Sequence, residues 1–196
     1  MAKPKLLLVD GSSLAFRAFF SILDLNRFKN SNGLHTNALY SFHRMFKAIL
    51  DSEKPTHVLV AWDAGKTTFR TEMYADYKGG RSKTPGEFIE QMPYFNVLLD
   101  AWGIPHYRLN QYEADDIIGT LAKQGEAAGY EVVVLSGDKD LIQLADNNIT
   151  VKITTKGVTE LVEYTPEVIF EKYGLTPEQI IDMKGLMGDS SDNYPG

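Results

Sequence analysis

The chain has 196 residues, of which 43% are hydrophobic, and it carries a formal net charge of −6 at pH 7. This length suits one domain with a packed core, and no apolar run reaches the roughly 18 residues that a membrane-spanning helix needs. The absence of cysteine excludes disulfides, thiolate metal ligands and a cysteine nucleophile. The acidic balance argues at first against a nucleic-acid partner, although charge can be segregated within one domain.

The first half of the chain predicts strands that alternate with helices. Apolar runs predict strands over residues 5–9 and 57–62. Apolar positions three and four apart predict a helix over 36–52, and a second one from Phe88 to Trp102 that ends at Gly103. Near-continuous apolar strands of this length are typical of a parallel sheet that is covered on both faces.

The second half continues the alternation. A weak apolar run over 104–109 and a strong one over 131–136 predict two more strands, with a helix over 113–128 between them. Residues 149–163 predict a hairpin that turns at Lys156–Gly157.

Two short helices are expected near the end of the chain. Thr165–Pro166 and Thr176–Pro177 each have the pattern of an N-cap followed by a proline in the first helical turn. Taken together, the alternating elements predict an α/β fold with a doubly wound, mostly parallel sheet and helices on both faces.

Three predicted strands end at or just before an aspartate, namely Asp10, Asp63 and Asp138. In open α/β sheets, ligands bind beyond the carboxyl ends of the strands, where the strand order reverses. An aspartate after a strand can also be a turn former or a helix N-cap, so one alone decides nothing. Three together favour a site.

A further acidic cluster opens the helix predicted over 113–128. Glu113, Asp115 and Asp116 fall within four residues. The helix dipole accounts for one or two acids at a helix N-terminus. Three acids so close together repel one another unless cations neutralise them.

Two more acidic pairs lie in glycine-containing turns, and they complete a set of nine candidate metal ligands. The set is Asp10, Asp63, Glu113, Asp115, Asp116, Asp138, Asp140, Asp189 and Asp192. So many carboxylates predict a hard divalent cation, Mg²⁺ or Mn²⁺, whereas zinc is disfavoured because no histidine lies near them at ligand spacing. Removing these nine from the 26 acidic residues leaves 17 against 20 lysines and arginines, so the acidity is concentrated rather than spread.

The stretch from Lys66 to Lys83 is basic, with five basic and two acidic residues. If it is helical, one face carries the set Arg70, Tyr74, Lys78 and Arg81. A cationic stripe with an aromatic ring suits a phosphate backbone and an unpaired base. A solvated helix face with lysines is the alternative interpretation.

Five motifs in order resemble the signatures of the flap endonuclease/5′-exonuclease family, and most closely the 5′-nuclease domains of bacterial DNA polymerases I. The motifs are Leu8–Ser12, Phe69–Arg70 with Tyr77–Arg81, Tyr112–Asp116, Gly137–Asp140 and Gly188–Asn193. The resemblance implies a PIN-like fold, two divalent metal ions (Mg²⁺ or Mn²⁺) and an arch over residues 67–85. The implied substrate is DNA with a 5′ flap, nick or gap, or an RNA–DNA hybrid end, and the implied roles are primer removal and repair. We therefore expect a hydrolase in the bacterial cytoplasm, at the nucleoid, that acts as a monomer and contacts no membrane.

The resemblance also implies roles for single residues. The first metal site takes Asp10, Asp63, Glu113, Asp115, Asp116 and Asp138, and the second takes Asp140, Asp189 and Asp192. The expected catalytic residues are Lys78, Arg81, which grips phosphate, and Asp116. The expected DNA-binding residues are Phe69, Arg70, Tyr74, Lys78, Arg81 and Lys83.

Family members continue past the last motif into a helix–hairpin–helix module, whereas this chain ends at Gly196, so we expect a truncated fragment. Whether a polymerase follows on the same chain is left open. One alternative is a Toprim-type domain, but its glutamate would stand where this chain has Asp10. The other alternative is a DNA-binding module that keeps the fold without catalysis.

Overall fold

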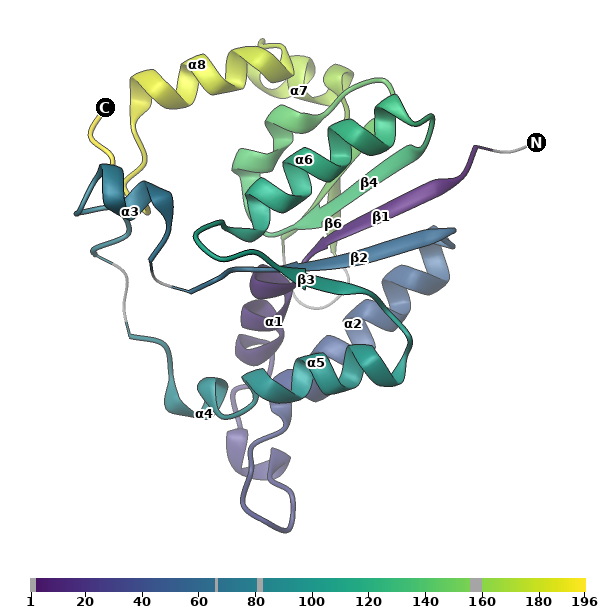
Figure 1. Ribbon diagram of the computed structural model, residues 1–196, viewed down its shortest axis with the longest axis vertical. Helices are drawn as coiled ribbons and strands as arrows, with labels where there is room; N and C mark the ends of the chain where they lie inside the picture. The colour runs from purple at the N-terminus through teal and green to yellow at the C-terminus, as the bar shows by residue number, and fades with distance from the viewer. Residues whose placement is uncertain (1–2, 66, 81–82, 156–159) are drawn as a thin grey trace.

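The computed structural model describes residues 3–65, 67–80, 83–155 and 160–196. Among these residues, six strands form one sheet in the order β3-β2-β1-β4-β5-β6 (Figure 1). The strands are β1 Lys5–Asp10, β2 His57–Trp62, β3 His106–Arg108, β4 Glu131–Ser136, β5 Ile149–Thr154 and β6 Leu161–Tyr164. The helices are α1 Gly11–Phe20, α2 Asn37–Glu53, α3 Phe69–Met73, α4 Gly86–Ile89, α5 Met92–Ala101, α6 Ala114–Ala127, α7 Pro166–Tyr173 and α8 Pro177–Met187, with 3-10 turns η1 Leu25–Phe28 and η2 Lys139–Leu144.

The strand order reverses at the centre of the sheet. From β1 the chain moves outward to β2 and β3 on one side, and then returns to place β4 on the other side of β1. Strands β1 to β5 pair in parallel, and only β6 pairs in the antiparallel sense, with β5. The loops that follow β1 and β4 therefore open at the same end of the sheet, on either side of the point of reversal.

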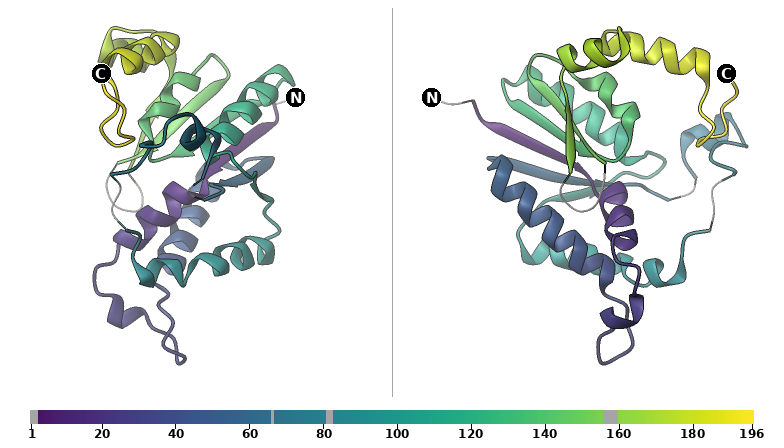
Figure 2. Two further views of the ribbon diagram at one scale, coloured as in Figure 1. Left: turned by 60° about the vertical axis from the view of Figure 1, so that its left-hand side comes forward. Right: turned by 180° about the vertical axis from the view of Figure 1, so that it is seen from behind.

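Both faces of the sheet are covered, as expected. Helices α1, α2 and α5 lie on one face, and α6, α7 and α8 lie on the other (Figures 1 and 2). The alternation of side chains along a strand builds both cores, because Leu7 and Val9 of β1 pack with the first layer and Leu8 with the second. The predicted doubly wound α/β sheet is confirmed.

Helix α1 was absent from the sequence-based expectations. The Gly11-Ser12-Ser13 run has the composition of a turn, yet it forms the first turn of a helix. Asp10 is the N-cap, since its Oδ1 accepts a hydrogen bond from the Ser13 amide at 2.9 Å. The helix then buries Leu14 and three other apolar side chains against the sheet.

The helix expected from Phe88 to Trp102 is divided into α4 and α5. Pro93 lies in the first turn of α5, where its missing amide leaves no intrahelical bond unmade. One continuous helix would place the proline ring against the carbonyl of Ile89, so the chain breaks at Gln91 instead. The expected end at Gly103 is confirmed, with a left-handed φ of 66°.

The basic stretch does not form one helix. Helix α3 ends at Met73, Tyr74 has an extended φ of −142°, and residues 75–80 form turns. The expectation of a shared helical face is therefore wrong for Arg70, Tyr74 and Lys78. Arg81 and Lys66 lie outside the described residues. The segment turns back because the side chain of Tyr77, which is 7% exposed, packs against the rest of the domain.

Candidate active site

The acidic residues gather where the strand order reverses. Asp10 ends β1, Asp63 follows β2, Asp138 follows β4, and Asp115 lies in the first turn of α6. The charges of Asp10, Asp63 and Asp138 all act on Asp115. The structure thus brings together four carboxylates that three strands and one helix deliver separately.

Burial and mutual repulsion disfavour ionisation within this group. Asp10 is 5% exposed. Burial, and then the charges of Asp63 and Asp138, raise its pKa to about 6, against hydrogen bonds from Ser13 and Ser136. Burial followed by the charges of three aspartates raises the pKa of Asp115 well above its ordinary range. A cluster of this kind favours a cation among its oxygens.

Serine hydroxyls hold the loops around Asp10 in place. Ser136 Oγ donates to Asp10 Oδ2 at 2.7 Å, and Ser13 Oγ accepts from the Gly137 amide at 2.9 Å. A Cβ atom on Gly137 would lie 2.5 Å from Ser13 Oγ, so the loops meet only because residue 137 has no side chain. Sequence reasoning missed Ser13 and Ser136, although Ser13 directly follows the motif around Asp10 and could have been noticed there.

Asp63 links β2 to the start of α6. Its Oδ1 accepts from the Ala114 amide at 2.9 Å, and its own amide donates to Ser12 Oγ at 3.1 Å. These two bonds fix the acidic opening of α6 beside the strand ends.

Two other expected ligands are paired with basic side chains. Arg70 donates to both oxygens of Asp116, at 2.8 and 2.7 Å, and Lys78 Nζ lies 2.8 Å from Glu113 Oε2. Tyr77 donates its hydroxyl to the same Glu113 oxygen at 3.1 Å. The hydrogen bonds from Arg70 lower the pKa of Asp116, although burial opposes them. Arg70 and Lys78 therefore point into the acidic site instead of forming an outward stripe.

A third group lies between η2 and the end of α8. Lys184 Nζ lies 2.7 Å from Asp140 Oδ1 and 3.0 Å from Asp189 Oδ2. Hydrogen bonds from Ser191, followed by Lys184, lower the pKa of Asp189. Asp192 is close enough to act on the pKa of Asp138. Lys184 was missed by sequence reasoning because its role depends on two loops that only the fold brings together.

The donor set suits a hard divalent cation, since it consists of carboxylate oxygens that burial and repulsion leave poorly compensated. In the described ranges, no three acidic or histidine side chains already stand close enough to hold one ion. The ion pairs made by Arg70, Lys78 and Lys184 occupy several of the carboxylates. Binding of a cation to those paired carboxylates would therefore require these side chains to exchange partners.

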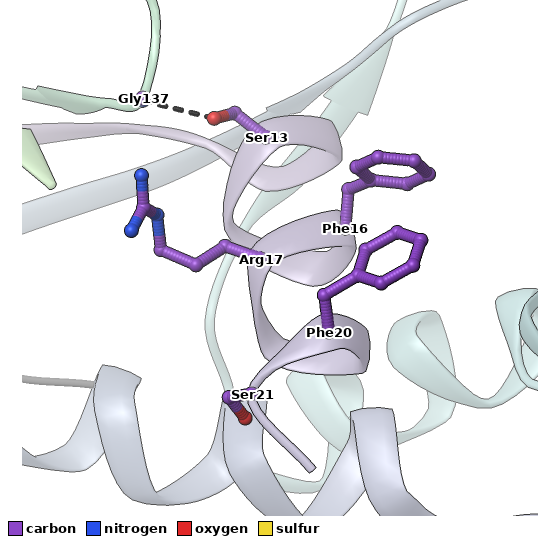
Figure 3. A pocket seen from close by; sticks show the side chains of 6 residues that line it. All are labelled: Ser13, Phe16, Arg17, Phe20, Ser21 and Gly137. Carbon is purple, nitrogen blue, oxygen red and sulfur yellow. Dashed lines mark hydrogen bonds between the residues drawn. The ribbon is translucent and has the colours of Figure 1, made fainter. Parts of the chain in front are cut away.

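A cavity of about 380 Å³ adjoins the acidic site (Figure 3). Ser13 and Gly137 line it and also border Asp10, while Phe16 and Phe20 are 44% and 50% exposed. Arg17 donates to the carbonyl of Thr154 at 2.7 Å and to that of Thr155 at 3.0 Å. These lining residues combine exposed aromatic rings with a cation, and sequence reasoning missed them.

The remaining expected DNA contacts lie around the segment after β2. Phe69 packs against Tyr112 with ring centroids 5.5 Å apart, and Tyr74 packs against Tyr194 at 5.2 Å. Lys83 is exposed. The described residues include no helix long and apolar enough to cross a membrane.

Comparison with known proteins identifies a family. Residues 5–174 match the sequence profile described as 5′-3′ exonuclease, N-terminal resolvase-like domain. The chain is 63% identical over 194 residues to DNA polymerase I of Bacillus subtilis (strain 168), and the match covers 99% of this chain. The chain spans 22% of the length of that polymerase.

Solved structures of bacteriophage T5 proteins share the fold. The T5 5′-exonuclease with bound zinc superposes with a TM-score of 0.72 at 26% identity, over 98% of this chain and 69% of that one. The T5 D15 flap endonuclease, in a pseudo-enzyme-product complex with DNA and metal ions, gives 0.70 at 26% identity with the same coverage.

Proposed function

This chain belongs to the 5′-3′ exonuclease family, and on that premise we propose that it is a divalent-metal-dependent 5′ nuclease that hydrolyses phosphodiester bonds in DNA. Its substrates are 5′ flaps, nicks and gaps, including RNA–DNA hybrid ends left by primers. It acts as a monomer at the bacterial nucleoid. The observation that carries the proposal is the convergence of Asp10, Asp63, Asp115 and Asp138 at the reversal point of the sheet.

The nine carboxylates would hold two Mg²⁺ or Mn²⁺ ions. The first group is Asp10, Asp63, Glu113, Asp115, Asp116 and Asp138, and the second is Asp140, Asp189 and Asp192. When bound, such ions lower the pKa of a coordinated water and neutralise charge on a phosphoryl group. The T5 structures with zinc, and with DNA and metal ions, support the binding of divalent metal ions in this fold.

Lys78 is the side chain best placed to bring a positive charge to a phosphate of the substrate. Its ammonium group lies 2.8 Å from Glu113 and acts electrostatically on Asp115. A phosphate that enters the site offers the ammonium group a new partner, and Lys78 then stabilises charge at the scissile phosphate. Arg70, whose planar guanidinium group already binds Asp116 with two hydrogen bonds, holds that carboxylate in position.

Phe16, Phe20 and Arg17 contribute to substrate binding beside the acidic residues. Exposed aromatic rings stack on unpaired bases, and a guanidinium group binds phosphate. The cavity that they line borders Ser13 and Gly137 (Figure 3), so a nucleotide in it lies next to the loop that carries Asp138.

The second candidate function is DNA binding without cleavage. The pairing of Arg70, Lys78 and Lys184 with four of the carboxylates favours it, because these ion pairs already satisfy charges that metal ions would otherwise neutralise.

The test is cleavage of a labelled 5′-flap DNA with Mg²⁺ or Mn²⁺. We expect cutting by the unaltered chain, loss of cutting in chelator, and losses on the order of 10²-fold or more for Asp116→Ala and Lys78→Ala. Asp182→Ala, at an exposed aspartate of α8, is the matched control and should cut normally. Equal rates for all four proteins would refute the proposed site, whereas salt-sensitive binding without cutting would support the second candidate.

A further inference from the structure

Two segments that are far apart in the sequence lie side by side next to the acidic site. One is residues 74–80, which we call the arch loop, and the other is residues 189–194, which we call the aspartate loop. Helix α3, which leads into the arch loop, lies beside the C-terminal end of the chain (Figure 1). The aspartate loop carries Asp189 and Asp192, and the arch loop carries Lys78. Contact between them therefore joins parts of the site that enter from different elements.

The two loops are joined first through the backbone of Lys78. Its amide donates to the carbonyl of Asp192 at 3.0 Å. Lys78 has a left-handed φ of 58°, a conformation that is unfavourable for a residue with a side chain. The hydrogen bond to Asp192 holds the backbone in the conformation that directs the ammonium group to Glu113.

Side chains extend this junction. Tyr74 donates its hydroxyl to the carbonyl of Asn193 at 3.2 Å, and the Asn193 amide group donates to the carbonyl of Asp76 at 3.1 Å. These bonds run in both directions across the contact, so the loops constrain each other.

Tyr194 adds an aromatic contact at the outer edge of the junction. Its ring centroid lies 5.2 Å from that of Tyr74 and 6.0 Å from that of Tyr77. Tyr77 in turn donates to Glu113, the residue that pairs with Lys78. A displacement of Tyr194 thus reaches Lys78 through two intervening side chains, those of Tyr77 and Glu113.

Tyr194 is itself fixed relative to the carboxylates. Its amide donates to the carbonyl of Asp189 at 2.8 Å, and its carbonyl accepts from the Asp189 amide at 3.0 Å. The aspartate loop is therefore closed on itself, with Tyr194 and Asp189 at its two ends.

We propose that Tyr194 is a positioning residue: its ring packs on Tyr74 and Tyr77 and so fixes the arch loop in the place where Lys78 meets the acidic site. Its catalytic consequence rests on the proposed function, whereas its effect on the arch loop does not. Tyr194 does not itself act on the scissile phosphate. Tyr194 sets the position of Lys78 relative to Asp189 and Asp192.

The test compares Tyr194→Ala with Tyr194→Phe, which keeps the ring, and with Tyr94→Ala as the matched control. Tyr94 and Tyr194 are both 45% exposed, but Tyr94 lies on α5, away from the junction. The first measurement is the rate of trypsin cleavage after Lys78 in the native protein. The second is kcat and KM on a 5′-flap DNA. Thermal melting checks that all four proteins are folded.

Loss of the ring should loosen the arch loop. The free energy of an aromatic pair corresponds to a change of about 2- to 12-fold in a rate. Tyr194→Ala should therefore speed trypsin cleavage after Lys78 by this factor and lower kcat by a similar factor. KM should stay within about twofold, because Tyr194 positions a residue that acts in the transition state. Tyr194→Phe and Tyr94→Ala should behave like the unaltered chain.

Three results would overturn the inference. Trypsin could cleave Tyr194→Ala after Lys78 no faster than it cleaves the unaltered chain. Alternatively, Tyr194→Phe or Tyr94→Ala could speed this cleavage as much as Tyr194→Ala does. An unaltered chain that does not cut flap DNA would refute the proposed function instead. In that case the trypsin rates still decide whether Tyr194 fixes the arch loop.

Discussion

The site has two sides that are built in different ways. On the strand side, Asp10 and Asp63 stand at the ends of buried strands and receive hydrogen bonds from backbone amides and serines. On the arch side, Arg70 and Lys78 come from a short helix and a turn, and they are held by ion pairs with Glu113 and Asp116. The residues of the strand side are positioned by strands of the buried core. The residues of the arch side are positioned by their ion pairs with the acidic residues of the site. Changes on the two sides should therefore differ in kind.

The largest effect is expected from Asp10→Asn on the strand side. We expect cutting to fall on the order of 10³-fold, because a carboxylate ligand is lost. In metal-free buffer at pH 7, the free energy of unfolding should rise by about 1–3 kcal/mol, because the raised pKa of Asp10 shows that its charged form is disfavoured in the fold. Denaturant unfolding and flap cleavage measure the two effects.

The pH dependence of the stability difference between Asp10→Asn and the unaltered chain is the control for this prediction. Since the pKa of Asp10 is about 6 when folded and 3.8 as a model value, the folded chain holds the proton more tightly between these values. The stability advantage of Asp10→Asn should be full above pH 6 and should vanish as the pH falls toward 4. An advantage that does not change with pH would contradict the account of Asp10.

The next largest effect is expected outside both sides, at Gln91 between α4 and α5. Gln91 is fully buried; its Oε1 accepts from the Ala38 amide at 3.0 Å, and its Nε2 donates to Asn37 Oδ1 at 2.9 Å. Gln91→Leu should lower the free energy of unfolding by about 2–3 kcal/mol, because it leaves buried partners without hydrogen bonds. Gln124→Leu, at an exposed position of α6, should change it by less than about 0.5 kcal/mol. Similar losses in both would show that the buried hydrogen bonds of Gln91 add no stability beyond that of an exposed glutamine.

A smaller effect is expected where the strand side is most crowded. Gly137→Ala should cost about 1–2 kcal/mol, because its Cβ would lie 2.5 Å from Ser13 Oγ. Ser13→Ala removes that oxygen, so the double variant should lose less than the sum of the two single variants. Chemical denaturation of the four proteins forms a double-mutant cycle, and strict additivity would rule out the clash.

The smallest effect is expected from Arg70→Lys on the arch side. Lysine keeps the charge but cannot make both hydrogen bonds to Asp116, so the loss of stability should be about 1 kcal/mol. Arg44→Lys, at another arginine that lies over an aromatic ring, serves as the control and should cost less. A loss for Arg70→Lys larger than that for Gly137→Ala on the strand side would contradict this ranking of the two sides.

The strand side could be predicted from the sequence because its rules are local. A buried apolar run ends at an aspartate, and parallel strands open at one end of the sheet, so Asp10, Asp63 and Asp138 had to converge. Helix α1 was missed because the same aspartate caps a helix that starts with turn-forming residues. Capping is a matter of side-chain geometry, which composition does not reveal.

The arch side could be predicted in its residue types but not in its geometry. Lys78 and Arg70 were expected in the site, where their ion pairs place them, yet a helical face was expected where α3 ends at Met73. The course of the segment depends on Tyr77 reaching Glu113, a contact across 36 positions of the chain. Lys184 escaped notice for the same reason, since Asp140 and Asp189 meet it only in the folded chain.

Asp10 shows how narrow the choice of residue at one position can become. As the N-cap of α1, the position accepts aspartate, asparagine, serine or threonine. As a cation ligand in the proposed function, the position requires a carboxylate, which leaves aspartate or glutamate. Aspartate alone belongs to both sets. Mutational scanning should therefore find two separate classes of failure at position 10: variants such as asparagine that fold and do not cut, and variants such as glutamate that keep the charge and weaken the start of the helix.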